Sequence, residues 1–186
     1  WRNTGRASVT WISPAQSQGA DVEVILVNAS TDPITTEALQ DQYPKLNERK
    51  AEPQMHVVAY NATVDQAQSC AIFYMESDEL EGNATTYWLY KLKDEESLAF
   101  ERYSSHSKNR DEGSWWLADN RGNHLSHQVM LEMGEVYRVY FTIKDNGAYD
   151  LNPNNGEIED PIVLVSTTPP DSTTGCLMNP RADFRL

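Results

Sequence analysis

Residues 144–161 hold a dense set of side chains that could bind a cation. The stretch crowds aspartates, glutamates and asparagines together, and Asp150, Asn152 and Asn154 stand at alternate positions. Alternating oxygen-bearing side chains in a tight turn converge on one point, and calcium in proteins takes roughly 6–8 oxygen ligands. The spacing therefore predicts a Ca²⁺ site. Its expected ligands are Asp145, Asp150, Asn152, Asn154 and Asp160.

A turn that needs no ion is the alternative. Asn, Asp, Gly and Pro form polar hairpins by themselves. The helix-flanked calcium loop does not fit, because its glycine would fall one residue before Gly156 and its final glutamate at Pro161. Like charges packed closely in a chain of net charge −13 repel one another, which favours a counter-ion.

The segments on either side of this loop, residues 136–143 and 162–165, predict strands because they are rich in β-branched and aromatic residues. The apolar end of residues 21–27 predicts a buried strand. Residues 127–133 are expected to form a hairpin with 136–143 around Gly134. Further strands are predicted at residues 7–12, 55–60, 70–75, 85–90, 98–103 and 114–117.

One short helix is predicted, with Asp32-Pro33 as its N-cap and first-turn proline and an end near Gln42. Residues 44–54 are charged and predict a solvated loop. About nine or ten strands with one helix predict an all-β fold, an antiparallel β-sandwich of the jelly-roll or immunoglobulin-like kind. We expect this domain to span residues 1–166, before a Pro/Thr-rich linker and tail at 167–186.

The loop resembles the end of a domain of bacterial surface proteins called choice-of-anchor U. That domain ends in a strand, an Asp-Gly-Gly-x-Gly-Asp-x-Asp loop and Asn-Gly-x-Ile-x-Asp-Pro. This chain departs at Asn146 and Tyr149, where the family has Gly, and at Asn152, where it has Asp. The resemblance extends over roughly residues 70–165. The matching loop residues are Asp145, Gly147, Asp150, Asn155, Gly156, Ile158, Asp160 and Pro161, and the upstream matches are Tyr87-Trp-Leu-Tyr-Lys91 and Trp115-Trp116.

The tail resembles the start of a C-terminal sorting signal of Gram-negative surface proteins. Gly175-Cys176 and Asn179-Pro180 precede Phe184, as in such signals, but the membrane helix and basic residues of the signal have no counterpart here. The resemblance implies that Cys176 is a processing or anchoring residue. A disulfide between Cys70 and Cys176 is the alternative for a secreted chain.

Three tryptophans are candidate ligand-binding residues: Trp88, Trp115 and Trp116. Adjacent residues on a strand face opposite sides, so one of Trp115 and Trp116 is expected in the core and the other at the surface. An exposed indole would offer a platform to a sugar ring or an apolar partner. A core edge covered by tryptophan is the favoured interpretation, and the exposed platform is the alternative.

These features lead to one expected function and two alternatives. The net charge of −13 disfavours nucleic acid and anionic lipid as partners, and no apolar run of roughly 18 residues predicts a membrane span. We expect a non-enzymatic extracellular module of a bacterial cell-surface protein, stabilised by Ca²⁺. It would mediate anchoring, assembly or adhesion through cell-surface proteins, glycans or self-assembly. The alternatives are a carbohydrate-binding module or lectin and, third, a polysaccharide-degrading enzyme.

Overall fold

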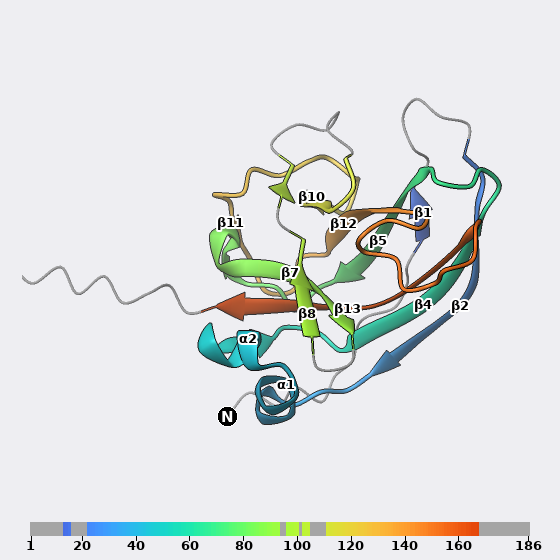
Figure 1. Cartoon of the computed structure of the whole chain (residues 1–186). Coiled ribbons are helices and arrows are strands. Elements are labelled where there is room, and N and C mark those ends of the chain that lie inside the picture. The colour runs from blue at the N-terminus through green and yellow to red at the C-terminus, as the bar shows by residue number, and fades with distance from the viewer. Residues whose placement is uncertain (1–12, 16–21, 94–95, 101, 105–110, 168–186) are drawn as a thin grey trace, which may run out of the picture.

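Two β-sheets pack face to face in the computed structural model of this chain (Figure 1). The structure describes residues 13–15, 22–93, 96–100, 102–104 and 111–167. Nearly all strand pairs are antiparallel, although β9 and β10 run parallel. The predicted all-β sandwich is confirmed.

The first sheet has the order β1-β5-β12-β10-β9. Its strands are β1 (Ser13–Ala15), β5 (Cys70–Ser77), β12 (Tyr137–Lys144), β10 (Ser114–Asp119) and β9 (Arg102–Tyr103). The second sheet has the order β2-β4-β13-β7-β8, and β3 (Ala51–Pro53) also pairs with β13. Its strands are β2 (Val24–Asp32), β4 (Val57–Val64), β13 (Glu157–Thr167), β7 (Tyr87–Lys93) and β8 (Glu96–Ala99).

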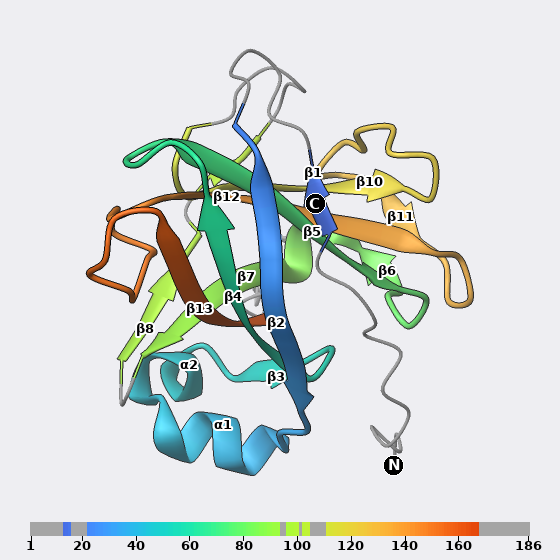
Figure 2. The same cartoon turned by 90° about the vertical axis from the view of Figure 1, so that its right-hand side faces the viewer.

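Strand β13 lies at the centre of the second sheet and separates two apolar clusters. Its even-numbered residues Ile158, Ile162 and Leu164 face the core between the sheets. Val163 and Val165 face the other side, because side chains alternate along a strand. Two short helices, α1 (Thr36–Gln42) and α2 (Pro44–Glu48), cover that outer face at one end (Figure 2).

The helical region differs from its prediction in two ways. Helix α1 begins after Thr35, whose hydroxyl accepts a hydrogen bond from Ala38 N at 3.1 Å, so Asp32 is not its N-cap. Residues 44–54, expected to be a solvated loop, form α2 and β3. Leu46 is fully buried against the outer face of the sheet, and this tertiary contact stabilises a helix that its charged sequence did not indicate.

Two predictions about strands are wrong, one about the burial of a strand and one about its pairing. Strand β2 lies at the sheet edge, where Ile25 is 56% exposed and Val27 is 64% exposed, so the apolar run does not mark a buried strand. The expected hairpin around Gly134 does not form. Strand β11 (Met130–Leu131) pairs with β6 (Gly82–Asn83), which leads into the 3₁₀ turn Ala84–Thr86, and Gly134 N donates to Asp78 O at 2.8 Å.

Candidate functional site

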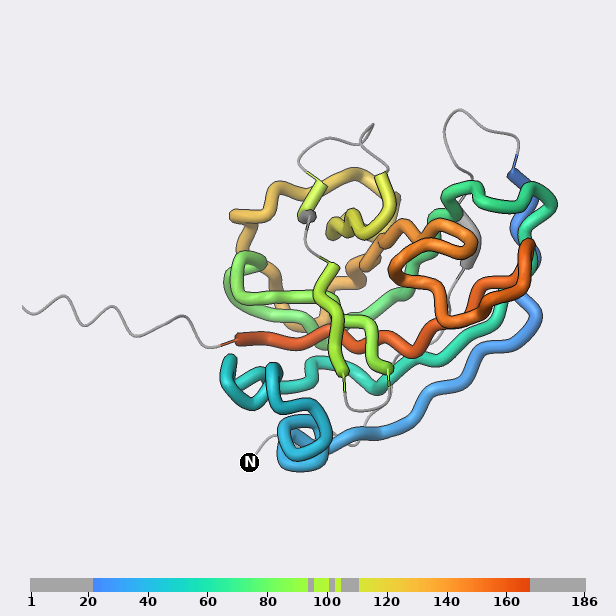
Figure 3. The backbone as a smooth tube through the Cα atoms, in the orientation of Figure 1, coloured from blue at the N-terminus to red at the C-terminus, as the bar shows by residue number. Residues whose placement is uncertain are grey.

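Asp145 is completely buried at the start of the loop and joins three chain segments. Its carboxylate accepts hydrogen bonds from Gln68 N at 2.7 Å and from Gly156 N at 3.0 Å. Its own backbone N–H donates to Ser69 O at 3.0 Å. Figure 3 shows the loop, in orange, beside the green turn that precedes β5. The side chain therefore attaches the loop both to that turn and to the start of β13.

Asp150 folds the loop onto itself. Its Oδ2 accepts from Asn146 N at 2.9 Å, and its Oδ1 accepts from Asn152 N at 2.9 Å and from Glu159 N at 3.1 Å. Hydrogen bonds from backbone donors to a carboxylate are among the stronger ones in proteins. Both oxygens thus have a structural role without any ion.

A polar rim on the same loop consists of the half-buried Asp150 and Asn152 and the exposed Asn154 and Glu157. Asn152 Oδ1 accepts from Asn154 N at 2.9 Å. The side-chain amides of both asparagines donate to Glu157 Oε2, each at 3.1 Å. The two amides turn their nitrogens toward Glu157, so a cation bound there would take the place of these N–H donors and need the amide oxygens turned toward it.

Asp160 lies in a different environment from the other predicted ligands. It is opposite Tyr60 on β4, on the sheet face that packs against the core, and it is completely buried. Neither of its carboxylate oxygens has a hydrogen-bond partner among the described residues. Burial raises the pKa of this carboxyl well above its usual range, although the cation of Lys91 opposes that shift.

Lys91 is the second buried charged side chain beside Asp160, and sequence reasoning did not single it out as a site residue. It is 3% exposed on β7, and its Nζ donates to Ala148 O at 3.2 Å. Burial lowers its pKa, while the charge of Asp160 opposes that shift. A signal was present in the sequence, because alternation from Tyr87 and Leu89 assigns Lys91 to the inward face.

The five predicted calcium ligands therefore occupy three places: Asp145 at a segment junction, Asp160 in the interior beside a lysine, and the others in the partly exposed turn. In the part of the chain that the structure describes, no three His, Cys, Asp or Glu side chains gather as a metal site. This arrangement does not present the full predicted set to one ion. The rim of Asp150, Asn152, Asn154 and Glu157 is the narrower set on which a calcium proposal rests.

Both adjacent tryptophans are buried, as a core edge covered by tryptophan requires, and the alternative that one of them is exposed is wrong. Trp115 packs in the core with Tyr103, while Trp116 stacks on Tyr140 with ring centroids 5.1 Å apart. Trp88 is partly exposed, and the guanidinium of Arg49 lies 5.3 Å from its ring centroid. Trp88 is thus the remaining partly exposed ring of the three.

Cys70 begins β5, and its side chain is partly exposed. Burial raises the pKa of its thiol, and Glu112 adds to that shift. Cys176 lies outside the described residues, as do the rest of the tail and the predicted strand at residues 7–12. The disulfide and the anchoring role of Cys176 both stay predictions.

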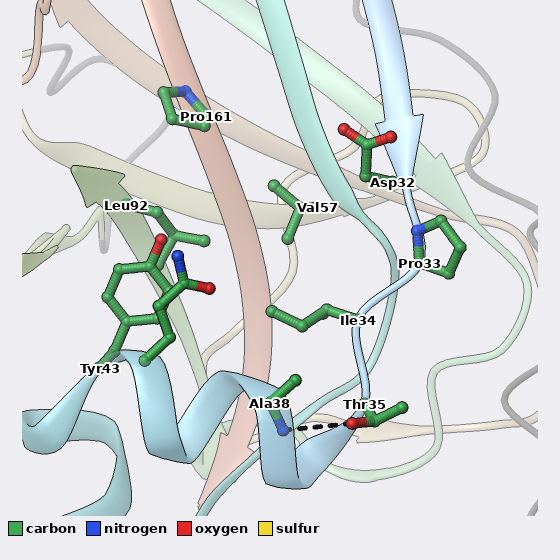
Figure 4. A pocket seen from close by; sticks show the side chains of 10 residues that line it. Asp32, Pro33, Ile34, Thr35, Ala38, Tyr43, Val57, Leu92 and Pro161 are labelled. Carbon is green, nitrogen blue, oxygen red and sulfur yellow. Dashed lines mark hydrogen bonds between the residues drawn. The ribbon is translucent and has the colours of Figure 1, made fainter. Parts of the chain in front are cut away.

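A hollow with a cavity volume of about 430 Å³ lies between α1 and the outer face of the second sheet. Figure 4 shows Ile34, Val57 and Leu92 pointing into it, with Thr35 and Ala38 hydrogen-bonded at the start of α1. Its lining also includes the polar residues Asp32, Gln42 and Tyr43.

Comparison of the chain with protein-family models, with curated proteins and with solved structures found no match. Neither α1 nor α2 is long, and within the described residues no helix has the length and apolar character needed to cross a bilayer.

Proposed function

We propose that this chain is a non-enzymatic extracellular module of a bacterial cell-surface protein that mediates anchoring, assembly or adhesion. The supporting observation is that acidic side chains of the loop accept hydrogen bonds from the backbone of this chain. The carboxylates of Asp145 and Asp150 are bonded to backbone N–H groups that hold three segments together. Acidic side chains placed in this way stabilise a rigid scaffold, and the surface acids of a chain at −13 keep it soluble.

Calcium stabilisation is part of this proposal. The rim of Asp150, Asn152, Asn154 and Glu157 is the site at which an ion would bind, in place of the amide donors that now face Glu157. The candidate partners are cell-surface proteins, glycans or further copies of this chain.

Surface location is tested on intact cells that produce the protein. An antibody against the folded domain should label intact cells, and brief protease treatment of those cells should remove the label. A cytoplasmic marker in the same cells should stay intact. Labelling that appears only after the cells are permeabilised would contradict the proposal.

A glycan array tests adhesion through carbohydrate. Binding that disappears in Trp88→Ala and persists in Met133→Ala, an exposed apolar residue elsewhere, would favour the lectin alternative. Turnover of a polysaccharide by the purified chain would overturn the non-enzymatic proposal.

A further inference from the structure

Lys91 and Asp160 are a buried basic side chain and a buried acidic side chain on neighbouring strands. Lys91 is opposite Ile162 in the pairing of β7 with β13, two residues from Asp160 along β13. Both side chains belong to the face that packs against the core, where Tyr60 is the cross-strand neighbour of Asp160. Such diagonal neighbours have Cα atoms about 7–8 Å apart, which is within reach of a long side chain.

The aspartate is unusual because it is buried without hydrogen bonds. Both of its oxygens and the hydroxyl of Tyr60 have no hydrogen-bond partner among the described residues. Buried polar groups in native proteins almost always have partners, and an exception needs a physical explanation. A carboxylate without partners is particularly unfavourable in an apolar interior.

We propose that Lys91 and Asp160 condense to an amide between Nζ and Cγ, which crosslinks β7 to β13 inside the folded domain. The inference goes beyond the proposed function and does not depend on it. The geometry that carries it is the burial of both groups, their placement on one face of adjacent strands, and the carboxyl group left without hydrogen bonds.

The reaction needs no group from outside the chain. The lone pair of the uncharged Lys91 amine attacks Cγ of the protonated Asp160 carboxyl and forms the C–N bond. The nitrogen then loses one proton, and the carboxyl hydroxyl leaves with it as water. The amide keeps one N–H, and no atom is oxidised or reduced. In water the two groups ionise and do not react, but burial disfavours both charged forms.

The surrounding residues suit the product. Ala148 O, which already accepts a hydrogen bond from Nζ at 3.2 Å, can keep the remaining amide N–H as its donor. The Tyr60 hydroxyl, directly across from Asp160, can donate to the new carbonyl and to the oxyanion that precedes it. Tyr60 is therefore assigned as a positioning residue that speeds the condensation.

The mass of the reduced, denatured protein tests the crosslink. The wild-type chain should be lighter than its sequence by one water molecule, and proteolysis should release a branched peptide that joins Lys91 to Asp160. Lys91→Arg and Asp160→Ala should have the full mass of their sequences. Lys93→Arg, an exposed lysine on the same strand, should still lose water.

Two further variants distinguish this crosslink from other reactions that remove water from the chain. Asp160→Asn should release ammonia instead of water and give the same amide. Tyr60→Phe should slow its formation after refolding while leaving the branched peptide unchanged. A wild-type chain of full mass overturns the proposal whether or not the variants fold. So does a loss of water that persists in Lys91→Arg or maps to another aspartate.

Discussion

At the scale of one residue, Asp145 shows that a carboxylate of the loop stabilises the fold by accepting hydrogen bonds from the backbone. The side chain is fully buried, and its two oxygens accept from Gln68 N and Gly156 N, which are far apart in the sequence. Both donors would otherwise lie near the base of the loop without partners. The carboxylate therefore does for this loop what an N-cap does for a helix, since it satisfies backbone groups that no other backbone group reaches.

Replacing Asp145 by Ala should lower the free energy of unfolding by about 3 kcal/mol, because two charge-assisted hydrogen bonds are lost and two donors remain without acceptors. Asp145→Asn should lose less, since its amide oxygen can still accept one of them. Urea unfolding measures these changes. The control is Asp41→Ala in α1, where an exposed aspartate should change stability by about 0.5 kcal/mol at most. Equal losses in Asp145→Ala and Asp41→Ala would contradict the assignment.

The sequence located the important acids but not their roles. Spacing shows that Asp145, Asp150 and Asp160 are close in the chain, and it suggested that they share an ion. It does not show that backbone donors from a distant turn reach Asp145, or that Asp160 follows the inward alternation of β13 into the core. Lys91 was missed as a site residue for the same reason, since its partner is set by strand pairing and not by proximity in sequence.

At the scale of elements, runs of β-branched and aromatic residues predicted most strands, because such side chains suit the pleated, half-buried surface of a sheet. They could not predict neighbours. The run at Val24–Val27 is as apolar as a central strand, yet β2 has a partner on one side only. The turn at Gly134 contains a hairpin signal, but the strand before it pairs with β6. Pairing depends on the whole topology, which a local pattern does not contain.

The turn before β10 packs against the loop through Gly113. Its φ is +77°, and an added Cβ would lie 2.6 Å from Cε2 of the Tyr149 ring. The Tyr149 hydroxyl donates to Ala99 O at 2.7 Å, and its ring lies 4.4 Å from that of Phe100, so the ring cannot easily move. Gly134 also has a positive φ, +91°, but an added Cβ there meets nothing within 4 Å.

Gly134→Ala should therefore lower the free energy of unfolding by about 1–2 kcal/mol, from the left-handed backbone alone. Gly113→Ala should lower it by about 1–3 kcal/mol more, because the new methyl group also forces the Tyr149 ring to shift. Chemical denaturation of the two variants side by side measures the difference. If both lose the same amount, Tyr149 does not fix this turn in the way that the structure indicates.

At the scale of the whole molecule, the described domain is a sandwich, and Tyr149 of the acidic loop packs into its core. The chain carries 28 acidic and 15 basic residues. A folded state of this charge is destabilised by its own repulsion, more strongly at low salt. A bound divalent cation would relieve part of that repulsion where the rim residues gather.

We expect Ca²⁺ to raise the melting temperature of the folded chain relative to EDTA at constant ionic strength. An ion that binds only the folded state adds RT ln(1 + [L]/Kd), about 2.7 kcal/mol at a hundredfold excess over Kd. Mg²⁺ should stabilise less, because it prefers a tight octahedron and retains its waters.

Substitutions at the rim residues test whether the calcium-dependent shift in melting temperature comes from this site. Glu157→Gln keeps the size of the side chain and an oxygen that can accept from Asn152 and Asn154, but it removes a charge, so it should reduce the calcium-dependent shift. Asn152→Asp adds a carboxylate and should enlarge the shift while lowering the melting temperature in EDTA. Glu48→Gln, on the exposed end of α2, should leave the shift unchanged. A wild-type melting temperature that is the same in EDTA and in Ca²⁺ would contradict the calcium proposal. The loop would then be ordered by hydrogen bonds alone, among them those that Asp145 and Asp150 accept from the backbone.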